Sequence, residues 1–170
     1  TELIDRLAQT VAQALAAEAP PHGEPPAALV GIRSRGEIIA RRLQERLTRR
    51  WDHAVDCGVL DITLYRDDLN QMGYQQPRVR STEIPFSIDD RVIVLVDDVL
   101  NTGRSVRAAL DALVDFGRPK AIRLAVLIDR GHRELPISAD YVGTVVEAPP
   151  DKRVNVYVRE VDDREEVVVE

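Results

Sequence analysis

The chain has 170 residues, of which 44% are apolar and 31% are charged, a composition typical of one globular domain. Its net charge of −6 argues against a general affinity for nucleic acids, and no apolar run approaches the roughly 20 residues that cross a membrane. The single cysteine excludes an internal disulfide and a cysteine-based metal cluster, so we expect one cytoplasmic domain over residues 1–170.

The first third of the chain predicts a helix, a strand and a second helix. Apolar residues at helical spacing predict an amphipathic helix over residues 2–18, and the apolar run 27–32 predicts a buried strand. The second helix is expected at about residues 37–50. The loop between strand and helix offers guanidinium groups and backbone N–H donors, which suit an anion. It consists of Arg33, Ser34, Arg35 and Gly36.

A long polar stretch follows the next predicted strand, which we expect over residues 55–65 and which includes residues 61–65. Stretches of more than about 12 residues without regular structure are commonly lids or binding loops. We therefore expect a flexible hood that closes over a site and excludes water, and the alternative is a plain connection between two strands. The candidate hood residues are Arg66, Asp67, Asp68, Arg78 and Arg80.

The central stretch of the chain combines a strand, two acids, a small polar loop and a helix. Residues 92–96 are all apolar, which predicts a strand buried on both faces. A helix that begins near Arg104 directs its free N–H groups at the loop, which suits a phosphate, and two carboxylates beside it suit sugar hydroxyls. The pattern predicts a site for ribose 5-phosphate, and the alternative is an ordinary strand that ends in an acidic turn. The predicted binding residues are Asp97, Asp98, Val99, Leu100, Asn101, Thr102, Gly103, Arg104 and Ser105.

The last third predicts another buried strand at residues 121–128, a short strand and turn at 137–146, and edge strands in the alternating tail, 154–169. A polar loop follows the strand 121–128, and such a loop is a natural place for a base-binding pocket. Its candidate residues are Asp129, Arg130 and His132. His132 is either a general base or, as is commoner for a histidine in a loop, a structural or solvated side chain.

Several of these segments resemble known enzymes. The run VIVLVDDVLNTGRS resembles the phosphoribosyl-pyrophosphate (PRPP) signature of type I phosphoribosyltransferases. The runs ITLYRDDL and DRGHRELPI are similar to the family of bifunctional pyrimidine-operon attenuation proteins and uracil phosphoribosyltransferases, and this resemblance covers roughly residues 3–163. It implies an α/β type I phosphoribosyltransferase fold: a central, mainly parallel sheet flanked by helices, with a flexible hood loop and C-terminal edge strands.

The resemblance also implies a reaction, in which uracil and PRPP give UMP and pyrophosphate. Asp97 and Asp98 would grip the ribose hydroxyls as the catalytic pair, the loop 102–105 would cradle the 5-phosphate, and the loop 33–36 would hold pyrophosphate. Arg78 and Arg80 would reach the pyrophosphate when the hood closes. Mg²⁺ would arrive bound to the substrate, with no ligand assigned directly to the protein. We assign no general base for uracil.

The resemblance also implies partners. Many members of this family bind the leader mRNA of a pyrimidine operon, with UMP or UTP as co-effector, and the family suggests a dimer or larger homo-oligomer. Affinity for RNA depends on cations that neutralise phosphates. The first helix carries Gln9, Gln13 and Glu18, and residue 138 is serine where arginine is typical, so we expect weakened RNA binding. Two alternatives remain: a non-catalytic RNA-binding regulator that responds to UMP or UTP, and a phosphoribosyltransferase for another base.

Overall fold

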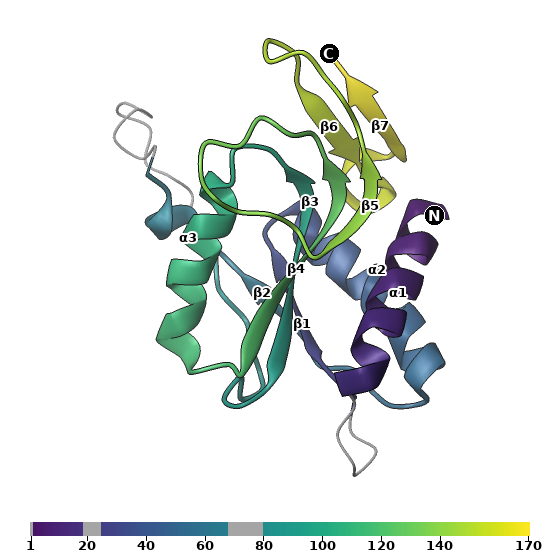
Figure 1. The fold of residues 1–170 in the computed structure, drawn as a ribbon, viewed down its shortest axis with the longest axis vertical. Coiled ribbons are helices and arrows are strands. Elements are labelled where there is room, and N and C mark those ends of the chain that lie inside the picture. Colours follow the sequence, from purple (N-terminus) through teal and green to yellow (C-terminus); the bar gives the residue numbers. More distant parts are fainter. Residues whose placement is uncertain (1, 19–24, 68–79) are drawn as a thin grey trace.

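A five-stranded parallel sheet forms the centre of the molecule (Figure 1). The computed structural model describes residues 2–18, 25–67 and 80–170. The hood residues Asp68 and Arg78 lie outside the described residues. The strand order is β2-β1-β3-β4-β5. The strands are β1 (Ala28–Ile32), β2 (Cys57–Leu60), β3 (Val92–Leu100), β4 (Ala121–Asp129) and β5 (Tyr141–Val145).

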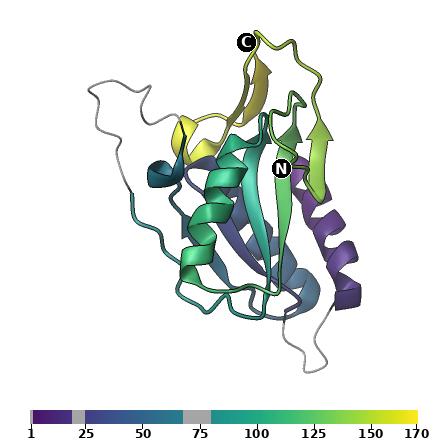
Figure 2. The same ribbon diagram turned by 60° about the vertical axis from the view of Figure 1, so that its left-hand side comes forward.

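Helices cover both faces of this sheet, as Figures 1 and 2 show. Helices α1 (Glu2–Leu15) and α2 (Arg35–Trp51) pack on one face, and α3 (Arg104–Leu113) packs on the other. Successive side chains of a strand point to opposite faces, so Val94 belongs to the core under α2 while Leu95 belongs to the core under α3. The predicted α/β class is confirmed. Among the described residues, no helix combines the length and apolar character that a membrane span requires.

The chain leaves the middle of the sheet in two directions. From β1 it continues to the outer neighbour β2, and from β3 it continues through β4 to β5 on the opposite side. In open α/β sheets, ligands bind beyond the carboxyl ends of the strands at the point where the strand order reverses. This point lies between β1 and β3, whose register pairs Gly31 with Val96. The two loops predicted to bind anions follow these two strands.

Strand β3 is longer than the sequence predicts. We expected it to end at Val96, but its pairing with β4 continues from Asp97 opposite Val126 to Leu100 opposite Asp129. Both acids therefore lie within the strand and not after it. The pairing with β4 extends the strand, and this long-range partner is not visible in the local sequence.

Residues 61–65 are not the strand that we predicted. After β2 the chain forms a 3-10 turn at Thr63–Tyr65. The carboxylate of Asp61 accepts hydrogen bonds from the backbone N–H of Thr63 at 3.0 Å and from its hydroxyl at 2.5 Å. An aspartate that bonds two residues ahead offers the backbone an alternative to a strand, which explains the turn.

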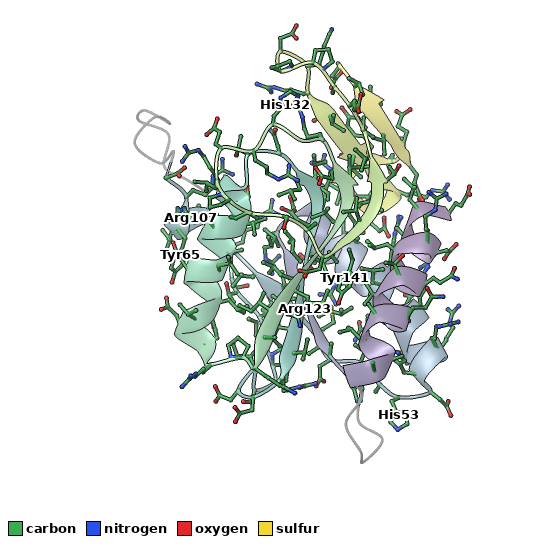
Figure 3. The ribbon with its side chains drawn as sticks, in the orientation of Figure 1. His53, Tyr65, Arg107, Arg123, His132 and Tyr141 are labelled. Atoms are coloured by element: carbon green, nitrogen blue, oxygen red, sulfur yellow. The ribbon has the colours of Figure 1, made fainter. Side chains whose placement is uncertain are left out.

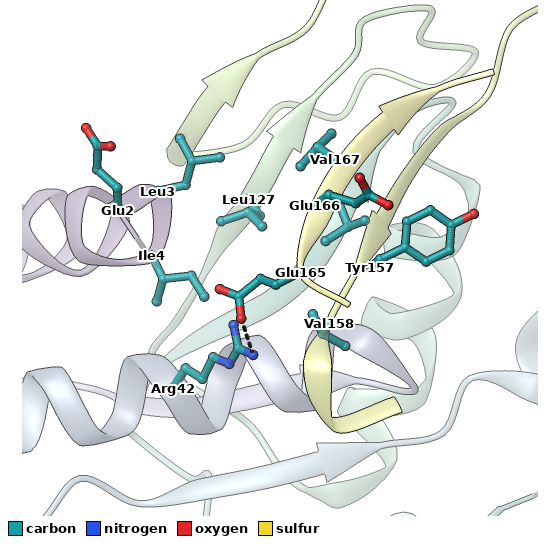
Figure 4. A pocket seen from close by; sticks show the side chains of 11 residues that line it. Glu2, Leu3, Ile4, Arg42, Leu127, Tyr157, Val158, Glu165, Glu166 and Val167 are labelled. Atoms are coloured by element: carbon teal, nitrogen blue, oxygen red, sulfur yellow. Dashed lines mark hydrogen bonds and ion pairs between the residues drawn. The ribbon is translucent and has the colours of Figure 1, made fainter. Parts of the chain in front are cut away.

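The tail forms a small unit of its own. Strands β6 (Val154–Tyr157) and β7 (Glu166–Val169) pair antiparallel with each other in a separate two-stranded sheet, so they do not extend the central sheet. The short helix α4 (Arg159–Asp162) connects them. A cavity of about 220 Å³ lies between the tail, α1 and β4, and Figure 4 shows Arg42 of α2 bound to Glu165 among its lining residues.

Candidate active site

A cavity of about 270 Å³ opens at the carboxyl ends of β1 and β3. Both anion-binding loops predicted from the sequence contribute to it, together with one described residue of the hood, Arg66. A second cavity of about 170 Å³ adjoins the first, because Arg66 and Ser105 line both. Of the predicted residues, the larger cavity brings together Arg33, Ser34, Arg35, Arg66, Asp97, Asp98, Val99 and Ser105, and the smaller adds Asp67, Thr102 and Arg104.

The two acids of β3 lie in different environments. Asp97 is only 8% exposed, whereas Asp98 is half-buried. Burial and the neighbouring carboxylate of Asp98 raise the pKa of Asp97 well above its usual value. The Asp97 carboxylate accepts a hydrogen bond from the backbone N–H of Asp98 at 2.9 Å, which fixes its direction. The pair therefore presents acceptor oxygens to the cavity on a rigid strand.

The loop from β3 to α3 is built to approach an anion. Gly103 has φ = 91°, a left-handed conformation that favours glycine, and α3 begins at the next residue. The carbonyl of Thr102 accepts hydrogen bonds from the backbone N–H groups of Glu134 and Leu135, at 3.0 and 3.2 Å. The loop is thereby anchored to the segment that follows β4. The first N–H groups of α3 lie at the smaller cavity, where they suit a phosphate.

The side chain of Arg104 already binds two carboxylates. Its guanidinium contacts Glu134 at 2.6 Å and Asp67 at 2.7 Å, and these hydrogen bonds raise the pKa of Arg104. All three side chains are more than a third exposed, so the pairs contribute little to stability. The pair with Asp67 connects the described start of the hood to α3, and the pair with Glu134 connects α3 to the segment that follows β4.

The loop after β1 becomes helical earlier than predicted, since α2 begins at Arg35. A Cβ atom on Gly36 would lie 2.6 Å from the carbonyl oxygen of Val96 and 3.1 Å from the Cα of Asp97. Glycine is therefore required for the close approach of α2 to β3. This contact places the loop 33–36 directly beside the acids.

The two arginines of this loop are held in different ways. The guanidinium of Arg33 donates to the carbonyl of Ser81 at 3.0 Å and also contacts Glu37 and Glu83. Arg35 binds Asp162 of the tail through two hydrogen bonds, at 2.8 and 3.1 Å. Both side chains still line the larger cavity.

The three residues predicted for the base pocket line neither of these two cavities. Asp129 pairs with Arg133 at 2.6 Å, and Arg130 is 7% exposed and donates to the carbonyl of Pro149 at 3.2 Å. Although burial alone would raise the pKa of Asp129, hydrogen bonds from Arg133 and from the N–H of Gly131 lower it.

His132, labelled in Figure 3, makes a contact that bears on its role as a base. Its Nε2 lies 2.7 Å from the carbonyl oxygen of Ala148. A carbonyl oxygen only accepts, so this nitrogen carries the proton. Nε2 therefore cannot take a proton from uracil, and Nδ1 is the only ring nitrogen that could act as a base.

Sequence reasoning missed several residues at this site. Asp61, Ile62 and Thr63 line the larger cavity although we had placed them in a strand. The spacing of an aspartate two residues before a threonine was the available signal for the turn. Asp162 lies 127 residues from its partner Arg35, and no local pattern could have joined the two.

Comparison with known proteins places the chain in a family. Residues 2–162 match the family described as "Phosphoribosyl transferase domain". "Bifunctional protein PyrR" of Pelotomaculum thermopropionicum is 58% identical over 141 residues, which cover 83% of this chain and 77% of that protein. The chain belongs to the PyrR family of phosphoribosyltransferases. "Bifunctional protein PyrR" of Thermus aquaticus is 56% identical over 140 residues, covering 82% of this chain and 77% of that protein.

Solved structures of phosphoribosyltransferases share the fold of this chain. A hypoxanthine phosphoribosyl transferase of Trypanosoma cruzi has a TM-score of 0.72 at 21% identity, covering 98% of this chain and 84% of that chain. A hypoxanthine phosphoribosyltransferase of Staphylococcus aureus has a TM-score of 0.65 at 20% identity, covering 96% and 85%. At these identities the likeness concerns the fold alone. The resemblance and the fold expected from the sequence are thus confirmed.

Proposed function

We propose that this PyrR-family protein is a uracil phosphoribosyltransferase, which converts uracil and PRPP to UMP and pyrophosphate, and that it regulates a pyrimidine operon. The observation that carries the enzymatic part is one cavity that holds the β3 acids, the start of α3 and the loop 33–36. Such a cavity offers acceptors for sugar hydroxyls beside donors for two separate phosphate groups.

The proposed reaction displaces pyrophosphate from the anomeric carbon of the ribose. Positive charge develops on the sugar, as in the cleavage of glycosides, and negative charge develops on the leaving group. Asp97 and Asp98 hold the ribose hydroxyls and favour the cationic sugar, and residues 99–105 receive the 5-phosphate. The loop 33–36, with Arg80 of the hood, stabilises the departing pyrophosphate. Positioning and electrostatics supply the catalysis.

Magnesium fits this site as a companion of the substrate. Within the described parts of the chain, no group of three or more His, Cys, Asp or Glu side chains could hold a metal ion. Mg²⁺ usually keeps several waters and binds through one or two carboxylates plus substrate phosphates, and Asp97 and Asp98 are the carboxylates in the cavity. Bound there with PRPP, the ion would neutralise charge on the diphosphate.

The base is proposed to enter beside the loop 129–132, which follows the neighbouring strand β4. This loop contains Asp129, Arg130 and His132, which are held in place by contacts with neighbouring residues. None of the three is assigned as a general base. Uracil can lose its N1 proton to solvent or to the pyrophosphate group itself once the sugar becomes electrophilic.

RNA binding is the second candidate function, and the PyrR membership favours it. The composition opposes it, because the net charge is −6 and the first helix has only Arg6 as a cation. We propose weakened binding to the leader mRNA of a pyrimidine operon, with UMP or UTP as co-effector, in a homo-oligomer in the cytoplasm. A gel shift with leader RNA at fixed salt, with and without UMP, measures this, and nanomolar, UMP-enhanced binding contradicts the weakening.

The decisive experiment for the enzyme compares acceptor bases. Wild-type protein with PRPP and Mg²⁺ is offered uracil, orotate or hypoxanthine, and the nucleotide formed is measured. Turnover with uracil alone supports the proposal. Turnover with orotate or hypoxanthine in its place assigns a different base, and no turnover with any base leaves the non-catalytic regulator that binds UMP or UTP.

A further inference from the structure

The loop 33–36 has two arginines, and in the described part of the chain they bind different segments. Arg35 binds the tail, whereas Arg33 binds Ser81, Glu37 and Glu83. Its Nη2 donates to one carboxylate oxygen of Asp162 at 2.8 Å, and its Nε donates to the other at 3.1 Å. This is the paired geometry in which one edge of the guanidinium plane matches both oxygens of a carboxylate. The direction of the guanidinium is therefore fixed by a residue outside the central sheet.

Asp162 is itself held in place. The same oxygen that contacts Nε accepts a hydrogen bond from the backbone N–H of Val158 at 2.8 Å, and the side chain is only 13% exposed. The Arg35 guanidinium and this N–H keep the pKa of Asp162 below its usual value, so the carboxylate remains charged. The ring of Tyr157 lies 5.8 Å from the guanidinium carbon of Arg35 and supports it from the side.

The paired geometry leaves part of Arg35 free for a ligand. An arginine has five N–H donors, and Asp162 takes one from Nε and one from Nη2. Nη1 has no partner among the described residues, and the side chain lines the larger cavity near Asp98. Arg35 can thus bind Asp162 and an anion in the cavity at the same time, and the two partners need not compete.

We propose that Asp162 is a positioning residue, which holds Arg35 in the orientation that binds the diphosphate of PRPP. This inference rests on the proposed function, because Arg35 there receives pyrophosphate. It gives the tail a role in the reaction: α4 carries the carboxylate that aims one arginine of the site. A ligand that lacks the diphosphate, such as UMP, should not depend on Asp162.

The test replaces Asp162 by asparagine, which keeps the shape but presents an N–H to the arginine and loses the charge. In D162N the KM for PRPP and the KM for pyrophosphate in the reverse reaction are expected to rise about tenfold, as for a misplaced binding group. The Kd for UMP should stay at the wild-type value, since its 5-phosphate binds at α3.

Glu160→Gln is the matched control. Glu160 lies on the same short helix and forms the same kind of pair with α2, since its two oxygens contact Arg42 at 2.9 and 2.6 Å, but neither residue lines the larger cavity. E160Q should leave the KM for PRPP unchanged. If D162N unfolds more readily than E160Q, D162E decides, because its restored carboxylate should return the KM for PRPP toward the wild-type value.

Three results overturn the inference: D162N with a wild-type KM for PRPP, D162N and E160Q with equal increases, or D162N with an equal loss of UMP binding. The last two would mean that the tail only supports the fold. The wild-type protein is tested before any variant is made. If it turns over no base and binds neither PRPP nor pyrophosphate, the proposed function itself is refuted, and the role of Asp162 is not the cause.

Discussion

The backbone N–H of Asp98 donates to the side chain of Asp97, so the two acids of β3 are joined by a hydrogen bond of 2.9 Å while only Asp97 is buried. The arrangement places a carboxylate where its charge is unfavourable. Burial beside a second acid raises the pKa of Asp97, and such sites usually serve function at some cost in stability.

Asp97→Asn should therefore lower activity and raise stability. Asparagine keeps an oxygen for the N–H of Asp98 but removes the buried charge. We expect turnover of uracil and PRPP to fall at least about 100-fold, and the unfolding free energy at pH 7 to rise by about 1 kcal/mol, or roughly 2–4 °C in melting temperature.

The stability gain should depend on pH. Because the pKa of Asp97 is higher in the folded than in the unfolded chain, the folded chain holds a proton that the unfolded chain has lost at any pH between these values. The wild-type fold thus loses stability as pH rises from about 4, the ordinary value for aspartate, through the raised value. Urea unfolding of D97N and wild type across this range should show a growing difference. The prediction is contradicted if the difference in unfolding free energy between D97N and wild type does not change with pH. It is also contradicted if the exposed control D151N shows the same difference.

Gly36→Ala tests the contact between α2 and the acids. The new methyl group would lie 2.6 Å from the carbonyl oxygen of Val96. This contact is too close, so the backbone of α2 or β3 would have to shift. We expect the free energy of unfolding to fall by about 1–3 kcal/mol, which is typical of overpacking. Turnover should fall as well, because the shift of β3 displaces Asp97. E45A, at an exposed position of α2, is the control. A G36A protein with normal turnover would show that the contact does not position the site.

Ser105→Ala tests the phosphate loop. Ser105 lines both cavities and lies in the first turn of α3, where its hydroxyl suits the 5-phosphate common to PRPP and UMP. The KM for PRPP and the Kd for UMP should rise together, by about 10- to 100-fold each, since a hydrogen bond to a charged group contributes roughly 1.5–3 kcal/mol and 1.4 kcal/mol is about tenfold. T10A on α1 serves as control. A change for PRPP alone would assign Ser105 to the diphosphate instead.

His132→Gln tests the general base. The amide of glutamine can still donate to the carbonyl of Ala148, so a structural histidine is replaced without loss. We expect turnover within about threefold of wild type and an unchanged pH profile. A general base contributes 100-fold or more and must be unprotonated to act. A fall of that size with loss of the low-pH limb of the pH profile would therefore reinstate His132 in that role.

The fold was predictable from the sequence where the signal is local. Residues 92–96 and 124–128 are apolar runs typical of a strand covered on both faces, and Gly103 marked the turn before α3. Pairing between distant segments was not predictable. The ladder with β4 carries β3 past Asp97 to Leu100, and the tail strands find each other and not the central sheet.

The candidate site divides in the same way. The residues of its two loops were identifiable because each loop carries its own chemistry beside its own strand. The partners that orient them were not, because Asp162 meets Arg35, and Glu134 meets Arg104, only after the chain has folded.

The two backbone hydrogen bonds from Glu134 and Leu135 to the carbonyl of Thr102 have a consequence for engineering. They fasten the segment proposed to select the base to the segment proposed to hold the sugar phosphate. Grafting a foreign loop over residues 129–135 to change the accepted base would therefore disturb phosphate binding as well, unless the graft reproduces both N–H groups. Redesign of base preference should keep the backbone of 134–135 and vary only the residues before it.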